Sequence, residues 1–459
     1  MDRDTICAIA SPEGRGAIGV IRISGRDAFA CLDRVFYAKS GKKAAERVPR
    51  DMVMGKIYHG DRLVDEGMCA VFFAPASYTG ENSAEIYCHG GRVVTREILA
   101  ALLESGCRLA RGGEFTERAF LNGKMDLAAA EAVEELIDAA NPVYVSTAAA
   151  NLSGRFGRRI REIRDELMDV AAHYAACLDY ADEGVEPPDP QAVEEKMLRA
   201  ERELQKLRAG CLDGKIVREG APVAIVGRTN SGKSTLLNYI LGYDRAIVTN
   251  IAGTTRDIIE ESISLKNGTL RFIDTAGFRE TDDPVERIGI ERSRESLARA
   301  EMVLMLFDGS TAPSEEDRIS AQAVENELKD RPNLQVFKVI NKQDKGLSFG
   351  YEAFLPELDP LYISAETGEG VDTLLESLEE SLKTGSDEAD LVTNLRHSDV
   401  IIRASDVLSA TVADQRMMMT DDVIWSGVIS ACEILGEITG DEVKEDMIQR
   451  IFAQFCVGK

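Results

Sequence analysis

One octapeptide, GRTNSGKS at residues 227–234, restricts the possible folds of this chain more than any other feature. It fits the pattern G-x-x-x-x-G-K-[ST], in which main-chain N–H groups enclose phosphate oxygens. An apolar run at 224–226 precedes it and a helical stretch at 235–241 follows it. This order predicts a strand, a phosphate-binding loop and a helix, because the glycines let the backbone wrap and a helix N-terminus attracts anions. An ordinary glycine-rich turn is the disfavoured alternative.

Two side chains of this loop are predicted to act on a triphosphate directly. Lys233 is expected to reach the β- and γ-phosphates, and the Ser234 hydroxyl is expected to ligate Mg²⁺. The loop alone would suit many nucleotide hydrolases, so the base has to be identified from other segments. The residues expected to bind the triphosphate here are Asn230, Ser231, Gly232, Lys233, Ser234 and Thr235.

The base is indicated by the tetrapeptide NKQD at residues 341–344, which follows a strand-like run. The Asp344 carboxylate can accept from both N1–H and the exocyclic amino group of guanine, whereas adenine has an acceptor at N1 and no 2-amino group. Ser-Ala-Glu at 364–366 is typical of a loop that contacts guanine through main-chain N–H groups. The expected guanine-binding residues are Asn341, Lys342, Asp344, Ser364, Ala365 and Glu366.

Two segments between these motifs are candidate switches. In Asp-Thr-Ala-Gly, residues 274–277, Asp274 would hold Mg²⁺ through water and Gly277 would let an N–H group approach the γ-phosphate. A strand-end turn is the alternative, which the fixed order of the motifs disfavours. In the other segment, Thr255 is the natural second hydroxyl ligand for Mg²⁺. The switch residues expected to bind GTP are Thr249, Asn250, Ile251, Ala252, Gly253, Thr254, Thr255, Asp274, Thr275, Ala276 and Gly277.

The residue after the second switch turn is Phe278, which cannot orient an attacking water as glutamine does in many GTPases. The transition state still needs positive charge between the β- and γ-phosphates. Asn230 offers a side-chain oxygen there. Main-chain oxygens of Thr249, Ile251 and Thr254 can complete a shell around a cation, so we expect a K⁺ ion. The alternative is that Asn230 only forms a turn.

Further motifs extend to both ends of the chain. They are GTTRD at 253–257, the stretch 4–25, SYTGE at 77–81, HGG at 89–91, the stretch 113–127 and Cys-Val-Gly-Lys at 456–459. Together with the motifs above, they make the chain similar to the MnmE (TrmE) family of tRNA modification GTPases, in the TrmE-Era-EngA-like superfamily. The C-x-G-K terminus and the TTRD switch are the specific parts of this resemblance, which spans essentially the whole chain.

The resemblance and the hydrophobic periodicity predict a multidomain α/β chain. Residues 1–123 are expected to form an α+β module that resembles a tetrahydrofolate-binding domain and builds a homodimer. Residues 220–383 are expected to form a Ras-like P-loop G domain, with a mostly parallel sheet and helices on both faces. That domain would be inserted into an all-α domain, whose halves are residues 124–219 and 384–459.

For the N-terminal module the resemblance implies a site for a tetrahydrofolate derivative, in the 5,10-methylene or 5-formyl form. The family's folate-binding positions fall on Arg22, Glu85, Lys124 and Lys459. Glu85 can pair with the N–H groups of a pterin, and the three cations suit its carbonyls or a glutamate tail. Without the resemblance, each could be an ordinary surface residue.

Two further residues are candidates for catalysis. The resemblance supplies Glu286 as the group that positions the attacking water, provided that K⁺-bound G domains dimerise and order the switches. Cys456, close to the C-terminus, is a candidate nucleophile for the chemistry at the uridine or the folate-borne carbon. The alternative for Cys456 is a small buried hydrophobic residue.

The activity that the resemblance implies is K⁺-dependent GTP hydrolysis coupled to tRNA modification. Together with an MnmG-type FAD protein, in a heterotetramer, the chain would help to add an aminomethyl or carboxymethylaminomethyl group at C5 of the wobble uridine, position 34. FAD and NADH would belong to that partner. One rival is a ribosome-assembly or RNA-chaperone GTPase of the Era/EngA type, which the acidic, helical C-terminal segment disfavours. The other is a nucleotide-gated scaffold that binds no folate.

Composition agrees with a globular chain in the cytoplasm. The nine cysteines are scattered without metal-ligand spacing, and we expect no signal peptide and no membrane span. The net charge of −25 argues against non-specific binding of nucleic acid, although residues 1–123 are nearly neutral. Five arginines of a predicted helix form a solvated, acid-paired face or a contact with tRNA or a partner: Arg155, Arg158, Arg159, Arg161 and Arg164.

Overall fold

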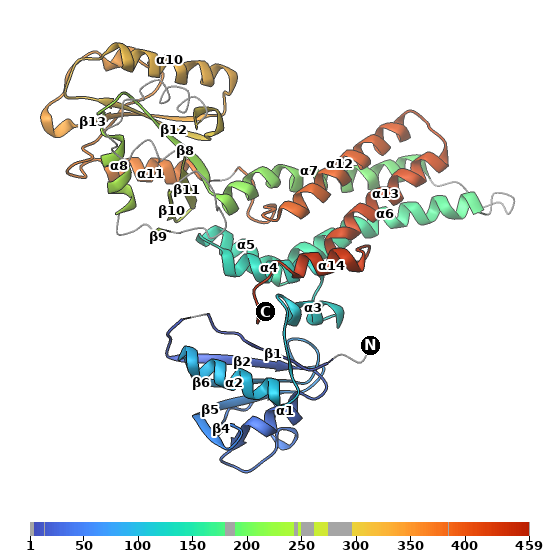
Figure 1. Cartoon of the computed structure of the whole chain (residues 1–459). Coiled ribbons are helices and arrows are strands. Elements are labelled where there is room, and N and C mark those ends of the chain that lie inside the picture. Colours follow the sequence, from blue (N-terminus) through green and yellow to red (C-terminus); the bar gives the residue numbers. More distant parts are fainter. Residues whose placement is uncertain are drawn as a thin grey trace. The chain divides into compact units, whose positions relative to one another are not determined.

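The computed structural model describes residues 4–12, 14–179, 189–242, 247–248, 261–273, 296–383 and 385–458 (Figure 1). The chain forms two compact units, each with its own β-sheet. The first unit comprises Met1–Ile137, Ala150–Met197 and Ala410–Lys459. The second unit comprises Asp138–Ala149 and Leu198–Ser409. Within the described residues, no helix has the length and apolar character that crossing a membrane requires.

The first unit contains a seven-stranded sheet, called here the N-terminal sheet, in the order β3-β4-β5-β6-β2-β1-β7. Helices α1 (Ala28–Val35) and α2 (Arg92–Glu104) cover one face of it (Figure 1). Buried residues such as Ile21 and Ile23 alternate with half-buried ones along β2, so the opposite face carries polar side chains. The strands are β1 (Ile6–Ile9), β2 (Ile18–Ser24), β3 (Phe36–Ala38), β4 (Val53–His59), β5 (Arg62–Phe72), β6 (Ser83–His89) and β7 (Arg108–Leu109).

The rest of the first unit is helical. Leu127 and Ala130 of α4 pack against Ile448 and Phe452 of α14, which joins segments far apart in sequence. Phe455 completes this small core and brings the C-terminal segment with it. The helices of this unit are α3 (Glu114–Leu121), α4 (Leu127–Asp138), α6 (Arg155–Asp179), α13 (Asp421–Thr439) and α14 (Glu445–Phe452), with a 3₁₀ turn, η1, at Ala44–Glu46. Most residues of α5 (Pro142–Leu152), α7 (Pro190–Glu219) and α12 (Leu395–Arg416) belong to the second unit.

The second unit contains another seven-stranded sheet, in the order β14-β13-β12-β8-β11-β10-β9. Its five strands from β14 to β11 are parallel, and β10 is antiparallel to both of its neighbours. The strands are β8 (Ala221–Val226), β9 (Ile247–Val248), β10 (Glu261–Leu265), β11 (Gly268–Phe272), β12 (Met302–Asp308), β13 (Gln335–Asn341) and β14 (Leu361–Tyr362).

Helices cover both faces of this second sheet. One core joins its strands to α8 (Lys233–Leu241) and α11 (Val371–Ser381), and a second core joins them to α10 (Glu315–Asp330). All seven residues of β12 are buried, and six of them are apolar. This is the pattern expected of a parallel strand that is covered on both faces. The multidomain α/β fold class, with a mostly parallel G-domain sheet, is therefore confirmed. Short 3₁₀ turns, η3 (Gln343–Lys345) and η4 (Tyr351–Ala353), follow β13.

Candidate functional site

The octapeptide forms the loop between β8 and α8, at the carboxyl end of the central strand. Asn230 and Gly232 adopt left-handed backbone, with φ of 63° and 99°. A Cβ atom on Gly227 would lie 2.3 Å from the Leu306 carbonyl oxygen, and one on Gly232 would lie 2.2 Å from Asn341 Nδ2. Both glycines are therefore required by close contacts, and Gly232 also by its left-handed backbone. The N–H groups of the loop lie next to the N-terminus of α8, which favours anions.

Lys233 is the first residue of α8, and its side chain folds back over the loop. Its Nζ donates to the carbonyl oxygens of Gly227 and Arg228, each at 2.8 Å. Burial lowers the pKa of Lys233. Among the described residues, this partly buried ammonium group is held by two carbonyl oxygens. It is well suited to bind an anion, because a phosphate offers it the opposite charge.

Asn341, the last residue of β13, joins three of the predicted motifs. Its Nδ2 donates to the Ser231 carbonyl oxygen at 2.9 Å, and its Oδ1 accepts from the Ala365 N–H, also at 2.9 Å. The side chain is almost fully buried. One amide thus fixes the phosphate loop and the Ser364–Glu366 loop relative to β13, so an amide is needed at this position rather than any polar side chain.

Lys342 makes a second link from the same motif to the phosphate loop. Its Nζ donates to the Asn230 carbonyl oxygen at 2.7 Å and to Asp308 Oδ2 at 2.8 Å. Asp308 also pairs with Arg228 at 3.1 Å. Burial opposes ionisation of Asp308, but hydrogen bonds from Lys342 and Ser310 hold its pKa below the usual range. The sequence did not single out Asp308; its only signal was an acidic residue at the end of an apolar run.

The remaining guanine-binding candidates lie around Asn341. Asp344 is exposed within η3, and Glu366 is exposed in the loop after β14. Ser364 is buried, and its Oγ accepts from the Thr367 N–H at 3.2 Å. The carboxylate of Asp344 is therefore accessible to a base that stacks beside the loop.

The predicted switch residues, the water-positioning residue and the terminal lysine lie outside the described residues. They are Thr249, Asn250, Ile251, Ala252, Gly253, Thr254, Thr255, Asp274, Thr275, Ala276, Gly277, Phe278, Glu286 and Lys459. The predicted Mg²⁺ ligand Ser234 and the predicted K⁺ ligand Asn230 are described, and the latter is exposed.

A second group of candidates lies in the first unit, on the polar face of the N-terminal sheet. Arg22 on β2 and Glu85 on β6 are paired in register, and Arg22 Nε donates to Glu85 Oε1 at 3.0 Å. The Tyr87 hydroxyl donates to the other carboxylate oxygen of Glu85. The guanidinium of Arg22 lies over the ring of Tyr78, 5.1 Å from its centroid. These contacts hold the Glu85 carboxyl group in a fixed orientation at a half-buried position.

The C-terminal segment reaches the same place. The carbonyl oxygen of Gly458 accepts from Arg22 Nη1 at 3.4 Å, and that of Cys456 accepts from the Gly113 N–H at 3.2 Å. The Cys456 side chain is exposed, so it does not pack in a core. Lys124 follows α3 in the sequence, and its Nζ donates to the Pro75 carbonyl oxygen at 3.0 Å.

Buried ion pairs support this group, and sequence reasoning missed them. Glu114 and Arg118 of α3 are each 3% exposed and pair at 3.0 Å. Arg118 also reaches Glu81, and Arg108 reaches Glu114 at 2.7 Å. Although burial acts in the opposite direction, the hydrogen bond from Arg108 and its neighbours lower the pKa of Glu114 to about 2. The spacing of Glu114 and Arg118, one helical turn apart, was the available signal.

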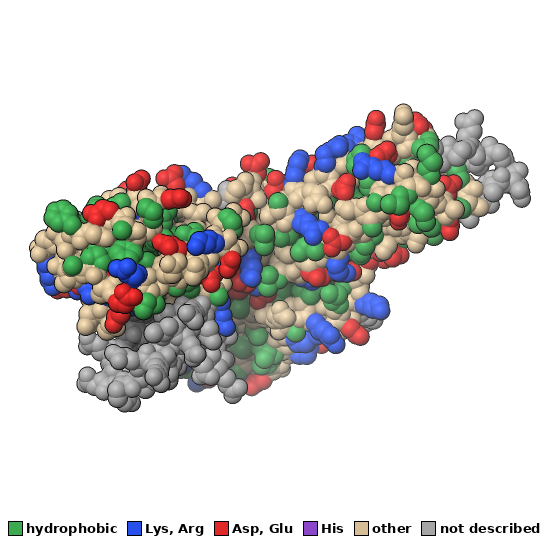
Figure 2. Space-filling view, turned by 90° about the horizontal axis from the view of Figure 1, so that it is seen from above, with side chains coloured by type: hydrophobic (Ala, Val, Ile, Leu, Met, Phe, Trp, Pro, Cys, Tyr) green, Lys and Arg blue, Asp and Glu red, His purple; other side chains and the backbone are tan. Residues whose placement is uncertain are grey.

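The five arginines of α6 are largely engaged with neighbouring groups. Arg161 pairs with Asp126 at 2.5 Å, and Arg164 pairs with Asp441 at 2.7 Å. The Arg158 side chain donates to the Ser153 carbonyl oxygen at 2.9 Å. Figure 2 shows acidic and basic side chains interspersed on the face that it presents. Arg161 and Arg164 have acidic partners, as the acid-paired interpretation of this helix predicts.

Known proteins match the chain from end to end. A family model described as the MnmE helical domain matches residues 127–456, and one described as the GTP-binding protein TrmE N-terminus matches residues 5–124. The tRNA modification GTPase MnmE of Clostridioides difficile (strain 630) is 39% identical over 99% of both chains. That of Syntrophus aciditrophicus (strain SB) is 41% identical over 100% of both chains.

Among solved structures, the G domain of the T. maritima FeoB iron transporter is 23% identical, with a TM-score of 0.26. The match covers 35% of this chain and 98% of the FeoB G-domain chain. This likeness is too low to carry an argument.

Proposed function

Because the chain belongs to the MnmE family of tRNA modification GTPases, we propose that its GTP hydrolysis drives modification of the wobble uridine at C5. The product would carry an aminomethyl or carboxymethylaminomethyl group at position 34 of certain tRNAs. The observation that carries the proposal is the Asn341 amide, which holds the phosphate loop and the Ser364–Glu366 loop together. That link lets one ligand contact both a triphosphate site and a guanine site.

In the nucleotide site, each candidate residue would have a separate task. Lys233 would pair with the β- and γ-phosphates, and Asp344 would select guanine. Ser234, with Thr255, would hold Mg²⁺, which neutralises charge that develops on the phosphates. The exposed Asn230 fits as a K⁺ ligand, since its backbone is fixed by Lys342 and its side chain is accessible. Glu286 would position the attacking water when the switches are ordered.

The N-terminal module would hold the tetrahydrofolate derivative, which supplies the one-carbon unit for the uridine. The Glu85 carboxylate fits the donor edge of a pterin, because each of its oxygens makes one contact and keeps a free lone pair. Arg22, Lys124 and Lys459 are cations for the rest of the folate. Cys456 is accessible for covalent chemistry, and its main chain is anchored beside Arg22 by Gly458.

We propose that the chain works in the cytoplasm as a homodimer built through the N-terminal module. An MnmG-type partner would bring FAD and NADH and form a heterotetramer with it. All nine cysteines are free, which suits a reducing compartment. The helical domain into which the G domain is inserted would couple nucleotide-driven rearrangement to the folate site.

Mass spectrometry of tRNA nucleosides tests this function. Deleting the gene should remove the C5 modification at position 34, and the full chain should restore it. A Glu85→Gln variant should fail to restore it while its GTPase rate stays normal, because that side chain lies on the N-terminal sheet. An unchanged uridine profile in the deletion strain would contradict the proposal. Equal GTPase rates in K⁺ and Na⁺ would contradict only the K⁺ requirement.

A further inference from the structure

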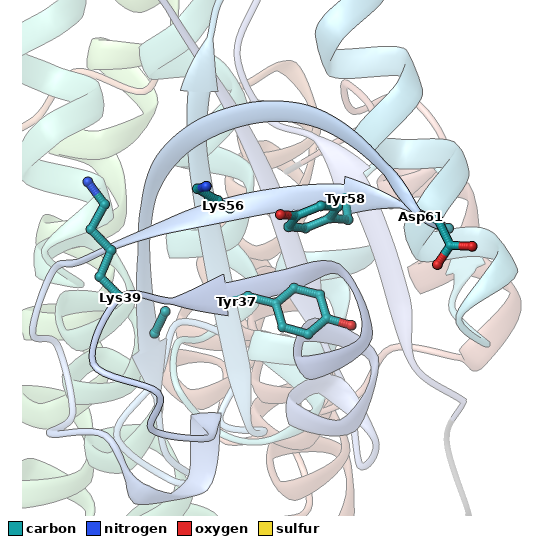
Figure 3. Close-up of a pocket in the computed structure, with 7 residues that line it drawn as sticks. Tyr37, Lys39, Lys56, Tyr58 and Asp61 are labelled. Atoms are coloured by element: carbon teal, nitrogen blue, oxygen red, sulfur yellow. The ribbon is translucent and has the colours of Figure 1, made fainter.

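A shallow cleft at the edge of the N-terminal sheet takes no part in the sites described above. Figure 3 shows Lys56 and Tyr58 along β4 and Tyr37 on the neighbouring strand, with Lys39 and Asp61 at opposite ends. Strand β3 is the outermost strand of the sheet. Strands β5 and β6 separate the two strands of the cleft from β2, which carries Arg22, so the cleft is a separate surface.

Two tyrosine rings form the apolar part of this cleft. The ring centroids of Tyr37 and Tyr58 are 5.4 Å apart, and the ring planes meet at 85°. Tyr37 is 52% exposed, although it lies on a strand. Because about half of the Tyr37 side chain is exposed, its ring is accessible to a planar ligand. Such an open ring is a stacking surface for a nucleobase.

Two lysines flank the rings, and both are weakly held. Lys39 and Lys56 share one partner, Glu66, at 3.8 and 3.9 Å. Their side chains are 60% and 47% exposed. Exposed pairs of this length contribute little to stability, so either ammonium group can turn to a ligand at small cost.

The surrounding segment is basic within an acidic chain. Residues 36–62 contain seven Lys or Arg, of which Arg47 is buried, and three Asp or Glu, whereas the whole chain has a net charge of −25. Lys42 and Lys43 extend the basic surface, and no ion pair in the described parts of the chain involves their ammonium groups. A polyanion would be repelled by most of this protein and attracted to this segment.

We propose that this cleft binds an unstacked nucleotide of the tRNA, which rests on the proposed function. A base would stack on Tyr37 and Tyr58, and adjacent phosphates would contact Lys39 and Lys56. Asp61 can accept a hydrogen bond from a ribose 2′-hydroxyl, which DNA lacks. The tyrosine pair favours a base over the glutamate tail of a folate, because that tail has charge but no planar ring.

Fluorescence anisotropy of the full-length protein with a labelled anticodon stem-loop tests the proposal. The double variant Lys39→Glu/Lys56→Glu should lower the affinity at least about tenfold and flatten its salt dependence. The control Lys329→Glu/Lys383→Glu makes the same change of net charge at exposed lysines of the second unit, and its affinity should stay within about twofold of the wild type. Tyr37→Ala should lower the affinity at least about fivefold, and Tyr37→Phe should not.

Circular dichroism and the GTPase rate show whether each variant is folded. If the wild type binds the stem-loop and the cleft variants bind it equally well, the cleft proposal is wrong and the proposed function stands. If the cleft variants lose tetrahydrofolate binding instead of RNA binding, the cleft is a folate subsite and the proposal is also wrong. If the wild type binds neither the stem-loop nor intact tRNA, the proposed function fails with it.

Discussion

The nucleotide site and the N-terminal folate candidate are built in different ways. In the nucleotide site, the described contacts are made mostly to main-chain oxygens: Lys233, Asn341 and Lys342 all donate to carbonyl groups of the loop. In the N-terminal site, side chains contact side chains, as in Arg22 with Glu85 and Glu114 with Arg118. The first design depends on local backbone shape, and the second depends on distant segments that meet in the fold.

This difference explains what the sequence could predict. The phosphate loop is contiguous, so its glycines and Lys233 reveal both a turn and a chemistry. The strand before it and the helix after it were predicted for the same reason, and the structure confirms them. The multidomain architecture followed from periodicity and from the resemblance together.

The N-terminal site could not be derived in that way. Arg22, Glu85 and Gly458 are separated by most of the chain, and only strand register and a C-terminal segment bring them together. Neither the pairing of Asp308 with Arg228 nor that of Glu114 with Arg108 was anticipated, because in each case the partner lies on another element. Contacts of that kind depend on tertiary structure, for which a single sequence has no local signal.

The largest effect should separate the two sites most clearly. Lys233→Ala should lower kcat/KM for GTP by on the order of 10²–10³-fold, because it removes the cation that stabilises charge in the transition state. Phosphate release measures it. Lys266→Ala, at an exposed lysine of the same unit, is the matched control and should leave the rate unchanged. If Lys233→Ala binds tetrahydrofolate normally, the two sites work independently. If its GTPase rate is close to normal, the role assigned to Lys233 is wrong.

The buried ion pairs should matter to the first unit alone. Arg118→Ala removes a buried guanidinium that pairs with both Glu114 and Glu81, and the loss of one partner of a buried ion pair costs about 3–5 kcal/mol of unfolding free energy. Chemical denaturation followed by circular dichroism measures the loss. The exposed Arg318→Ala is the control, since its pairing is with exposed Glu315. A stability loss below about 1 kcal/mol would mean that the pair is not what holds α3 in place.

The smallest effect concerns pH. His59 contacts Glu97 and Glu104, each at 3.1 Å, and the hydrogen bond to Glu97 is the main cause that raises the pKa of His59. This stabilisation is fully present below the unfolded-state pKa of about 6.5 and is lost as pH rises through the higher folded pKa. Solvent screening limits it to a few tenths of a kcal/mol. The free energies of unfolding of the wild type and of His59→Gln, measured between pH 5 and 9, should converge at the alkaline end. A difference that stays constant with pH would exclude titration of His59 as the cause of the stabilisation.

The most direct test of the central claim, that this chain uses guanine nucleotides, is competition for binding by GTP, ATP and XTP. The wild type should prefer GTP strongly, because Asp344 accepts from two guanine donors that adenine lacks. Asp344→Asn should weaken GTP binding and gain XTP binding, since an amide can donate to the 2-oxo group of xanthine. Equal affinity of the wild type for GTP and ATP would contradict the account.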